Sequence, residues 1–274
     1  MHRFSRNWGA CNVGGWHMLS ALSRWFHIRL RSDKGFTLIE MSIVLVIIGL
    51  IIGGILKGQE IIGTARSKAV INEINAARSA VNTYYDRYRA LPGDDPNGNT
   101  RVDPRLIAGN GDGVVGPSPG PTTAPGMANV SNANQGENYQ YFKALVAAGL
   151  LNGAEVGPVG TIQSTAFGVG SSLPASPVTG AGMTVVYGTH DGDVSTPTTK
   201  VTAHWYRMHK DPAAAKAAFS PRELANIDNQ VDDGLPSEGG VRGDGSANCA
   251  PQTLNAVYTL SDNIACIGFF LAHP

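Results

Sequence analysis

A long apolar run occupies residues 36–56 and contains a single acidic side chain, Glu40, near its start. As a helix these 21 residues would measure about 31 Å, which is enough to cross the hydrocarbon core of a bilayer. A charge at membrane depth costs roughly 2.5–3.5 kcal/mol on insertion scales, so a lone acid there indicates a function. The pattern therefore predicts a membrane helix with an acid near its first turn.

Beyond residue 56 the run becomes amphipathic, with apolar side chains every third or fourth position. This predicted face consists of Val70, Ile74, Ala77, Val81, Tyr84 or Tyr85, and Tyr88. No proline occurs before the Leu91-Pro92-Gly93-Asp94-Asp95-Pro96 turn, which should end the helix. We therefore expect one helix over residues 36–91, with a membrane-spanning first half and a second half that packs on a globular head.

The remaining residues, 92–274, should form that head. Residues 92–135 are rich in turn formers and predict a long loop. Residues 137–151 predict a second helix with Tyr141 or Phe142, Leu145, Val146 and Leu150 facing inward. Residues 183–187 and 201–208 are rich in β-branched and aromatic side chains and predict strands.

Two further helix starts and a final hairpin follow. One helix should start at Asp211-Pro212, and another at the capping box of Ser220 and Glu223, with Leu224, Ile227 and Val231 buried. Residues 234–245 predict a loop, and residues 256–260 and 264–271 predict two strands joined around residues 261–263. The fold class is thus α+β, with a long helix along a small antiparallel sheet.

Charge is distributed unevenly, although Lys and Arg balance Asp and Glu overall. Residues 1–35 contain six Lys and Arg against one Asp, a net charge of +5, so the other 239 residues carry −5. Basic segments beside a membrane helix stay in the cytoplasm, which predicts a single-pass membrane protein whose C-terminal head lies on the opposite side of the membrane. The acidic head argues against nucleic acid as a partner.

Residues 1–35 also differ from an ordinary secretory signal, because they lack a continuous apolar core before Gly35. We interpret them as a basic leader peptide. Translation from Met1 makes this leader long, and a start at Met18 would shorten it. The sequence leaves both starts open.

The junction between leader and helix reads Lys34-Gly35-Phe36-Thr37-Leu38-Ile39-Glu40-Met41. It closely resembles the N-terminal signature of type IV prepilins and type II secretion pseudopilins. The resemblance implies that a prepilin peptidase cuts between Gly35 and Phe36 and methylates Phe36. It also implies assembly with other subunits on an inner-membrane platform, with Thr37 and Glu40 as assembly residues. Glu40 would neutralise the new ammonium group of Phe36, since an unpaired ion inside an apolar bundle is costly.

We expect the function to be structural, as a subunit of a type IV pilus or a type II secretion pseudopilus and not an enzyme. The length of the cleaved chain favours a minor subunit, whereas a C-terminal disulfide would favour a pilin. The alternative is a membrane-anchored periplasmic binding or sensory protein that does not polymerise. An anchored hydrolase using Ser220 or Ser246 is a third interpretation, but the sequence has no Gly-x-Ser-x-Gly elbow.

Three cysteines are present, of which Cys11 lies in the leader. Cys249 and Cys266 form an even pair in the exported part, which favours a disulfide over two buried free thiols. Chain entropy predicts a stabilisation of about 3 kcal/mol for a loop of this length.

No cofactor is expected, and the metal candidates are weak. Asp95, Asn97, Asn99 and Asp112 are oxygen ligands in Gly-bearing loops that suit a structural Ca²⁺. However, Leu106 stands where a calcium loop needs its twelfth-position Glu, so ordinary turns are preferred. His190, His204 and His209 fit no tight metal motif and are expected to be surface residues of strands. The Leu91–Asp94 turn and the loop from Ile227-Asp228 to Leu235-Pro236 also resemble features of prepilin-like proteins.

Overall fold

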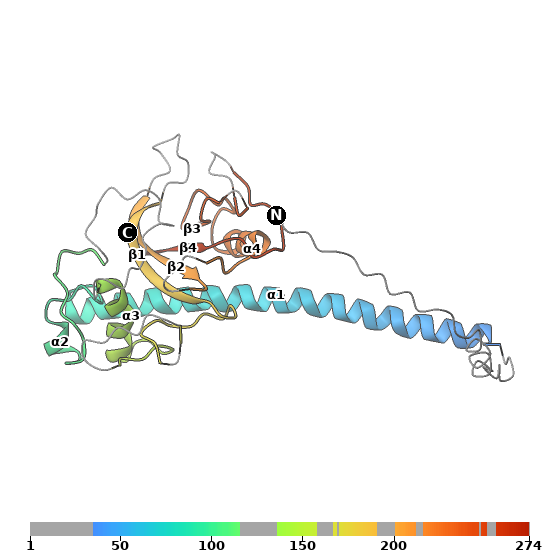
Figure 1. Cartoon of the computed structure of the whole chain (residues 1–274), viewed down its shortest axis with the longest axis horizontal. Coiled ribbons are helices and arrows are strands. Elements are labelled where there is room, and N and C mark those ends of the chain that lie inside the picture. The colour runs from blue at the N-terminus through green and yellow to red at the C-terminus, as the bar shows by residue number, and fades with distance from the viewer. Residues whose placement is uncertain are drawn as a thin grey trace, which may run out of the picture. The chain divides into compact units, whose positions relative to one another are not determined.

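The computed structural model describes residues 35–115, 136–157, 167–168, 170–190, 201–211, 216–246, 248–250 and 256–273. The chain divides into two compact units, Met1–Ile55 and Leu56–Pro274. The first unit contains the start of helix α1, and the second contains the rest of α1 together with an antiparallel sheet and three shorter helices (Figure 1). The α+β class predicted from the sequence is confirmed.

Helix α1 extends over Leu38–Tyr88, 51 residues. Among the described residues it is the one helix that is long and apolar enough to cross a membrane. It ends three residues before the predicted Leu91, because Arg89 adopts a left-handed conformation with φ of 54°. That conformation interrupts the helix before Pro92 can do so.

The predicted apolar face of α1 is confirmed in the second unit. Its buried residues are Ser67, Val70, Ile74, Ala77, Ala80, Val81 and Tyr84. Tyr85 is 47% exposed, so Tyr84 is the tyrosine that enters the core. Tyr88 is only partly buried but still packs against this core.

Four strands form the sheet in the order β1-β2-β4-β3. They are β1 (Gly182–His190), β2 (Val201–His209), β3 (Val241–Arg242) and β4 (Gly268–His273). Val185 pairs with Tyr206, and Tyr206 pairs with Phe270, so these side chains share one face. That face joins α1, α3 and α4 in the main core. The opposite face holds a second apolar cluster that contains Val186, Ala203, Trp205, Ile267 and Phe269.

Helix α3 (Glu137–Ala147) is shorter than predicted. Gly149, with φ of 69°, ends it, and the Gly149 and Leu150 N–H groups donate to the carbonyls of Val146 and Leu145. Tyr141 and Phe142 are both buried, and the Tyr141 hydroxyl lies 3.0 Å from that of Tyr206. A one-turn helix, α2 (Gly98–Arg101), interrupts the long loop predicted after residue 92.

Helix α4 (Pro221–Val231) starts at the predicted capping box, with Ser220 as N-cap. Leu224 and Ile227 are buried as expected, but Val231 is 42% exposed. Its predicted burial is wrong: Val231 is the last residue of the helix, and Asp232, the C-cap that follows it, is no longer helical. The helix predicted from Asp211-Pro212 begins at the edge of a described segment, which stops at Asp211.

The predicted C-terminal hairpin is wrong. Residues 256–260 form no strand, and β4 pairs instead with β2 and β3, although β3 falls in a predicted loop. The Thr259 N–H donates to the Cys249 carbonyl, and Cys266 pairs with Phe219 in an isolated bridge. The predicted Cys249–Cys266 disulfide is present, and both cysteines are buried in the main core.

Candidate functional site

The predicted cleavage site lies just outside the first helix. Gly35, Phe36 and Thr37 precede α1 and are not helical, and the Phe36 side chain is 80% exposed. A Cβ atom built on Gly35 would meet no atom within 4 Å. The Gly35–Phe36 peptide bond is thus free of packing constraints from the described residues. The rest of the leader, residues 1–34, lies outside them.

Thr37 and Glu40 form a reciprocal hydrogen-bonded pair at the start of α1. The Thr37 N–H and hydroxyl both donate to Glu40 Oε2, at 2.8 and 2.7 Å. The Glu40 N–H donates in return to Thr37 Oγ1 at 3.3 Å. This is a capping box, which satisfies N–H groups that have no partner at a helix start. We did not predict it, although the Thr-x-x-Glu spacing before an apolar run is its sequence signal.

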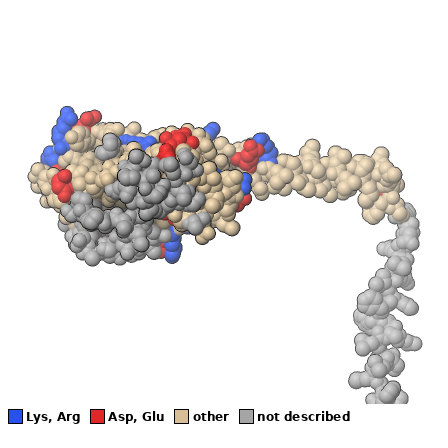
Figure 2. Space-filling model, turned by 90° about the horizontal axis from the view of Figure 1, so that it is seen from above, with Lys and Arg blue, Asp and Glu red and all other residues tan. Residues whose placement is uncertain are grey.

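The helix that follows this pair is apolar all round. Residues 41–56 contain no Asp, Glu, Lys or Arg, which is visible as an unbroken uncharged surface (Figure 2). Its large apolar side chains are all at least 41% exposed. Such a surface can contact either lipid or other helices of the same kind. Replacing lipid by these helices leaves its side chains in apolar surroundings.

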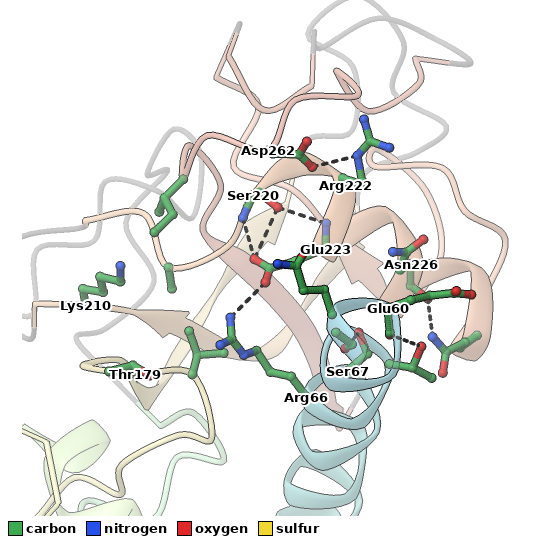
Figure 3. Close-up of a pocket in the computed structure, with 17 residues that line it drawn as sticks. Glu60, Arg66, Ser67, Thr179, Lys210, Ser220, Arg222, Glu223, Asn226 and Asp262 are labelled. Atoms are coloured by element: carbon green, nitrogen blue, oxygen red, sulfur yellow. Dashed lines mark hydrogen bonds and ion pairs between the residues drawn. The ribbon is translucent and has the colours of Figure 1, made fainter. Parts of the chain in front are cut away.

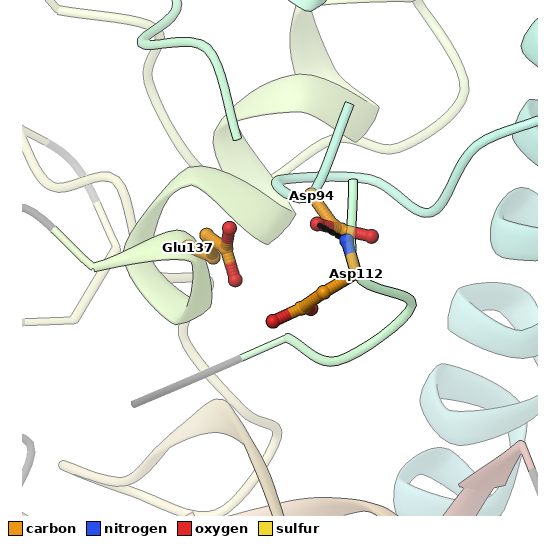
Figure 4. Close-up of side chains that lie close together, drawn as sticks. All are labelled: Asp94, Asp112 and Glu137. Atoms are coloured by element: carbon orange, nitrogen blue, oxygen red, sulfur yellow. Dashed lines mark hydrogen bonds between the residues drawn. The ribbon is translucent and has the colours of Figure 1, made fainter. Parts of the chain in front are cut away.

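In the head, three carboxylates converge where the 94–112 loop meets α3 (Figure 4). They belong to Asp94, Asp112 and Glu137. Asp94 Oδ1 accepts the N–H groups of Gly111 and Asp112, and its Oδ2 accepts that of Gly113. Burial raises the pKa of Asp94, while these bonds oppose the shift. The buried acid is thus an anchor for the loop.

The four residues that the sequence suggested as Ca²⁺ ligands lie in different surroundings from one another. Asp112 belongs to the group around Asp94. The Asp95 carboxylate instead accepts the Asn97 N–H at 2.9 Å and forms an ion pair with Arg101 at 2.5 Å. Asn97 is the N-cap of α2 but makes no side-chain cap bond, and Asn99 lies within that helix. Asp95 therefore already has a cation beside it.

A groove of about 780 Å³ lies between α1 and the start of α4 (Figure 3). Two ion pairs line it: Arg66 with Glu223 at 3.1 Å, and Arg222 with Asp262 at 2.8 Å. The Ser220 hydroxyl is used by its capping box, where it accepts the Glu223 N–H at 3.2 Å. Ser246, the other serine considered, donates to Asp244 at 3.0 Å. Neither hydroxyl has the histidine partner that a hydrolase nucleophile needs among these bonds.

The predicted surface position of the histidines is wrong for two of them. His204 is 3% exposed and His209 is fully buried. Both faces of the sheet carry apolar clusters, so side chains on either face of β2 are covered. His204 Nε2 accepts the Val115 N–H at 3.0 Å, and burial lowers the pKa of His204 to about 3. The side chain of His190 lies outside the described residues.

Residues 30–56 match the family model described as "Prokaryotic N-terminal methylation motif". No curated protein and no solved structure matches the chain. The matched segment contains the Gly35–Phe36 bond, the Thr37–Glu40 pair and the whole apolar run. Residues 30–56 are therefore a prepilin-type cleavage and methylation segment, the kind of segment with which type IV pilin-like and pseudopilin-like proteins begin.

Proposed function

We propose that this protein is a structural subunit of a type IV pilus or a type II secretion pseudopilus. A prepilin peptidase would cut after Gly35 and methylate Phe36, and the trimmed subunit would join other subunits on an inner-membrane assembly platform. The observation that carries this proposal is the methylation motif over residues 30–56. The exposed, non-helical Gly35–Phe36 junction supports it, because a peptidase needs an extended and accessible bond.

Assembly would use the uncharged surface of residues 41–56 and the carboxylate of Glu40. Packing of these helices would draw the ammonium group of each Phe36 into an apolar bundle, where an unpaired ion is very costly. Both Thr37 bonds end on Glu40 Oε2. Glu40 Oε1 thus has no partner in the described part of the chain and is available to a neighbouring ammonium group.

The membrane placement that we propose rests on the same helix. Its apolar run would span the inner membrane, with the basic leader in the cytoplasm and the head in the periplasm. The Cys249–Cys266 disulfide is compatible with that oxidising compartment.

One observation favours the second candidate function, a membrane-anchored binding protein that does not polymerise. The groove between α1 and α4 is large enough for a small polar ligand. Most of its charged side chains are nevertheless already paired within the chain: Arg66 with Glu223, Arg222 with Asp262, and Glu60 with Lys57. We therefore place the filament function first.

A pair of glycine variants tests the processing step. Gly35 and Gly49 both have open space where a Cβ atom would lie, so a larger side chain at either position meets no clash with the described residues of the subunit. We expect Gly35→Val to accumulate with its leader attached, whereas Gly49→Val is trimmed like the wild type. Electrophoresis of the cellular protein distinguishes the chain that retains its leader from the shorter, trimmed chain. Equal trimming of Gly35→Val and wild type would contradict cleavage at this bond.

A further inference from the structure

Exposed apolar side chains of the head are concentrated in one short segment, residues 257–264. Among the described residues outside 36–88, four large apolar side chains are exposed, and three of these belong to that segment. They are Val257, Leu260 and Ile264, with 68%, 74% and 54% of the residue exposed. Single exposed apolar residues need no explanation, but a concentration of them marks an interaction surface.

The backbone that carries these side chains is held firmly by the head. Tyr258 points into the core, where its hydroxyl donates to Asp228 Oδ2 at 2.9 Å. Arg222 donates from its backbone N–H to the Ser261 carbonyl at 3.4 Å and from its guanidinium to the Leu260 carbonyl at 3.2 Å. Polar groups of the segment are thus satisfied within the head, and its apolar side chains point outward from a fixed backbone.

The segment lies beside the part of α1 that follows the apolar run. Asp262 and Ile264 line the same groove as Glu60 and Gly63 of α1 (Figure 3). Along the helix, Glu60 and Gly63 are about 6 and 10.5 Å beyond Leu56, the last residue of the run. The headgroup layer on each side of a bilayer is about 5–7 Å thick. If Leu56 marks the edge of the hydrocarbon, this groove therefore begins at the level of the lipid headgroups.

The side chains around the segment are compatible with a lipid surface. Asp262, the one acidic residue of the segment, forms an ion pair with Arg222 at 2.8 Å. The long side chains of Arg222 and Lys210, which both line the groove, suit contact with lipid phosphates. On α1, Ile61 and Ile62 are also exposed and extend the apolar surface at the same level.

We propose that the 257–264 segment contacts the phospholipid bilayer while the chain is anchored in it, with Val257, Leu260 and Ile264 inserted among the lipid headgroups. This inference rests on the membrane placement proposed above. Membrane helices tilt by about 20° on average, and a tilt toward this side lowers the segment into the headgroup layer. Each CH₂ group that lipid buries favours the contact by roughly fourfold.

The test uses the full chain reconstituted in phosphatidylcholine vesicles, with either ordinary acyl chains or chains brominated near the headgroup. Bromine quenches tryptophan only at close approach, and the wild type supplies the background of the four native tryptophans. Leu260→Trp reports on the segment. Tyr85→Trp is the matched control, because Tyr85 is an exposed residue of α1 about 44 Å of helix beyond Leu56. We expect brominated lipid to remove most of the added emission of Leu260→Trp and none of that of Tyr85→Trp.

A second reporter, Ile264→Trp, covers the case in which Leu260→Trp fails to fold. We expect it to be quenched as well, and to lose this quenching when Leu260→Asp is added, because a charge is costly to place beside acyl chains. Leu45→Trp, in the apolar run, tests the membrane placement by itself.

The outcomes separate the segment from the anchor. Quenching of Leu45→Trp without quenching of Leu260→Trp and Ile264→Trp would overturn the proposal and leave the membrane placement intact. Unquenched Leu45→Trp would refute both. Emission of Leu260→Trp that shifts with protein concentration but not with bromine would assign the segment to a contact between copies of the chain, and would also overturn the proposal.

Discussion

Glu40 binds Thr37 through one of its two carboxylate oxygens. Oε2 accepts both the N–H and the hydroxyl of Thr37, at 2.8 and 2.7 Å, while Oε1 remains available among the described residues. One acid can thus perform two tasks, capping its own helix and neutralising the ammonium group of a neighbouring Phe36. The two tasks differ in what they require, because a cap needs only an acceptor whereas neutralisation needs a charge.

Glu40→Gln separates these tasks. Glutamine retains an oxygen that accepts the Thr37 N–H, since capping boxes use Glu or Gln alike. It has no charge to offer an ammonium group. We expect Glu40→Gln to be inserted and trimmed normally but to be nearly absent from filaments, as measured by immunoblots of sheared filaments against cell-bound protein.

Thr37→Val is the companion variant. It removes the hydroxyl donor at 2.7 Å but leaves the Thr37 N–H and the charge of Glu40. We expect it to assemble at a level well above that of Glu40→Gln, because the charge that neutralises the ammonium group is retained. A Glu40→Gln subunit that polymerises as well as Thr37→Val would show that the charge is not needed.

Gly93 and Gly113 form a matched pair for the loop that follows α1. Both are left-handed, with φ of 85° and 81°, so alanine at either costs about 1 kcal/mol in backbone strain. A Cβ on Gly93 would lie 2.3 Å from the Glu137 carbonyl oxygen, whereas one on Gly113 meets nothing within 4 Å. We expect Gly93→Ala to lower the free energy of unfolding by about 3 kcal/mol or more. Chemical denaturation of both variants measures this, and equal losses would contradict the close packing of Gly93 on α3.

Glu73 makes the stability of the head depend on pH. Burial raises the pKa of this α1 side chain from 4.5 to about 7. Because the folded pKa exceeds the unfolded one, its contribution is complete below about pH 4.5 and is lost as pH rises through about 7. Burial also raises the pKa of Asp228 to about 7, which adds a slope of the same sign.

Glu73→Gln isolates the contribution of Glu73. We expect the fall in unfolding free energy between about pH 4.5 and pH 8 to shrink by about 1–2 kcal/mol, after allowance for the partial exposure of this side chain. Denaturant titrations across this pH range measure it. An unchanged slope in Glu73→Gln would mean that Glu73 is ionised in the folded head.

The Cys249–Cys266 bridge should account for much of the stability of the C-terminal segment. Its 17-residue separation corresponds to about 3 kcal/mol of chain entropy. We expect a reductant to lower the unfolding midpoint of the wild type to that of a Cys249→Ala, Cys266→Ala double variant. A wild-type midpoint that does not respond to complete reduction would contradict this contribution.

Elements with a strong local pattern were predictable from the sequence. The three- and four-residue spacing of Val70, Ile74 and Tyr84 determines the buried face of α1, and Ser220 with Glu223 determines the start of α4. The capping box of Thr37 and Glu40 carried an equally clear signal, which was overlooked because the acid was interpreted only as a charge in the membrane and as the partner of the Phe36 ammonium group.

Features that depend on long-range pairing were not predictable. Residues 256–260 include β-branched and aromatic side chains that are typical of strands, but hydrogen bonds from Thr259 to Cys249 hold them in another conformation. The burial of His204 and His209 depends on the apolar clusters that pack on both faces of the sheet. A local sequence pattern cannot predict these clusters.

Mass spectrometry of the mature N-terminus tests the central claim most directly. The protein would be recovered from cells with an active prepilin peptidase and from matched cells without one. A subunit of this kind gives an N-terminal peptide that begins at methylated Phe36 in the first case, and a chain that retains Lys34 and Gly35 in the second. An intact leader in the presence of the active peptidase would contradict the account.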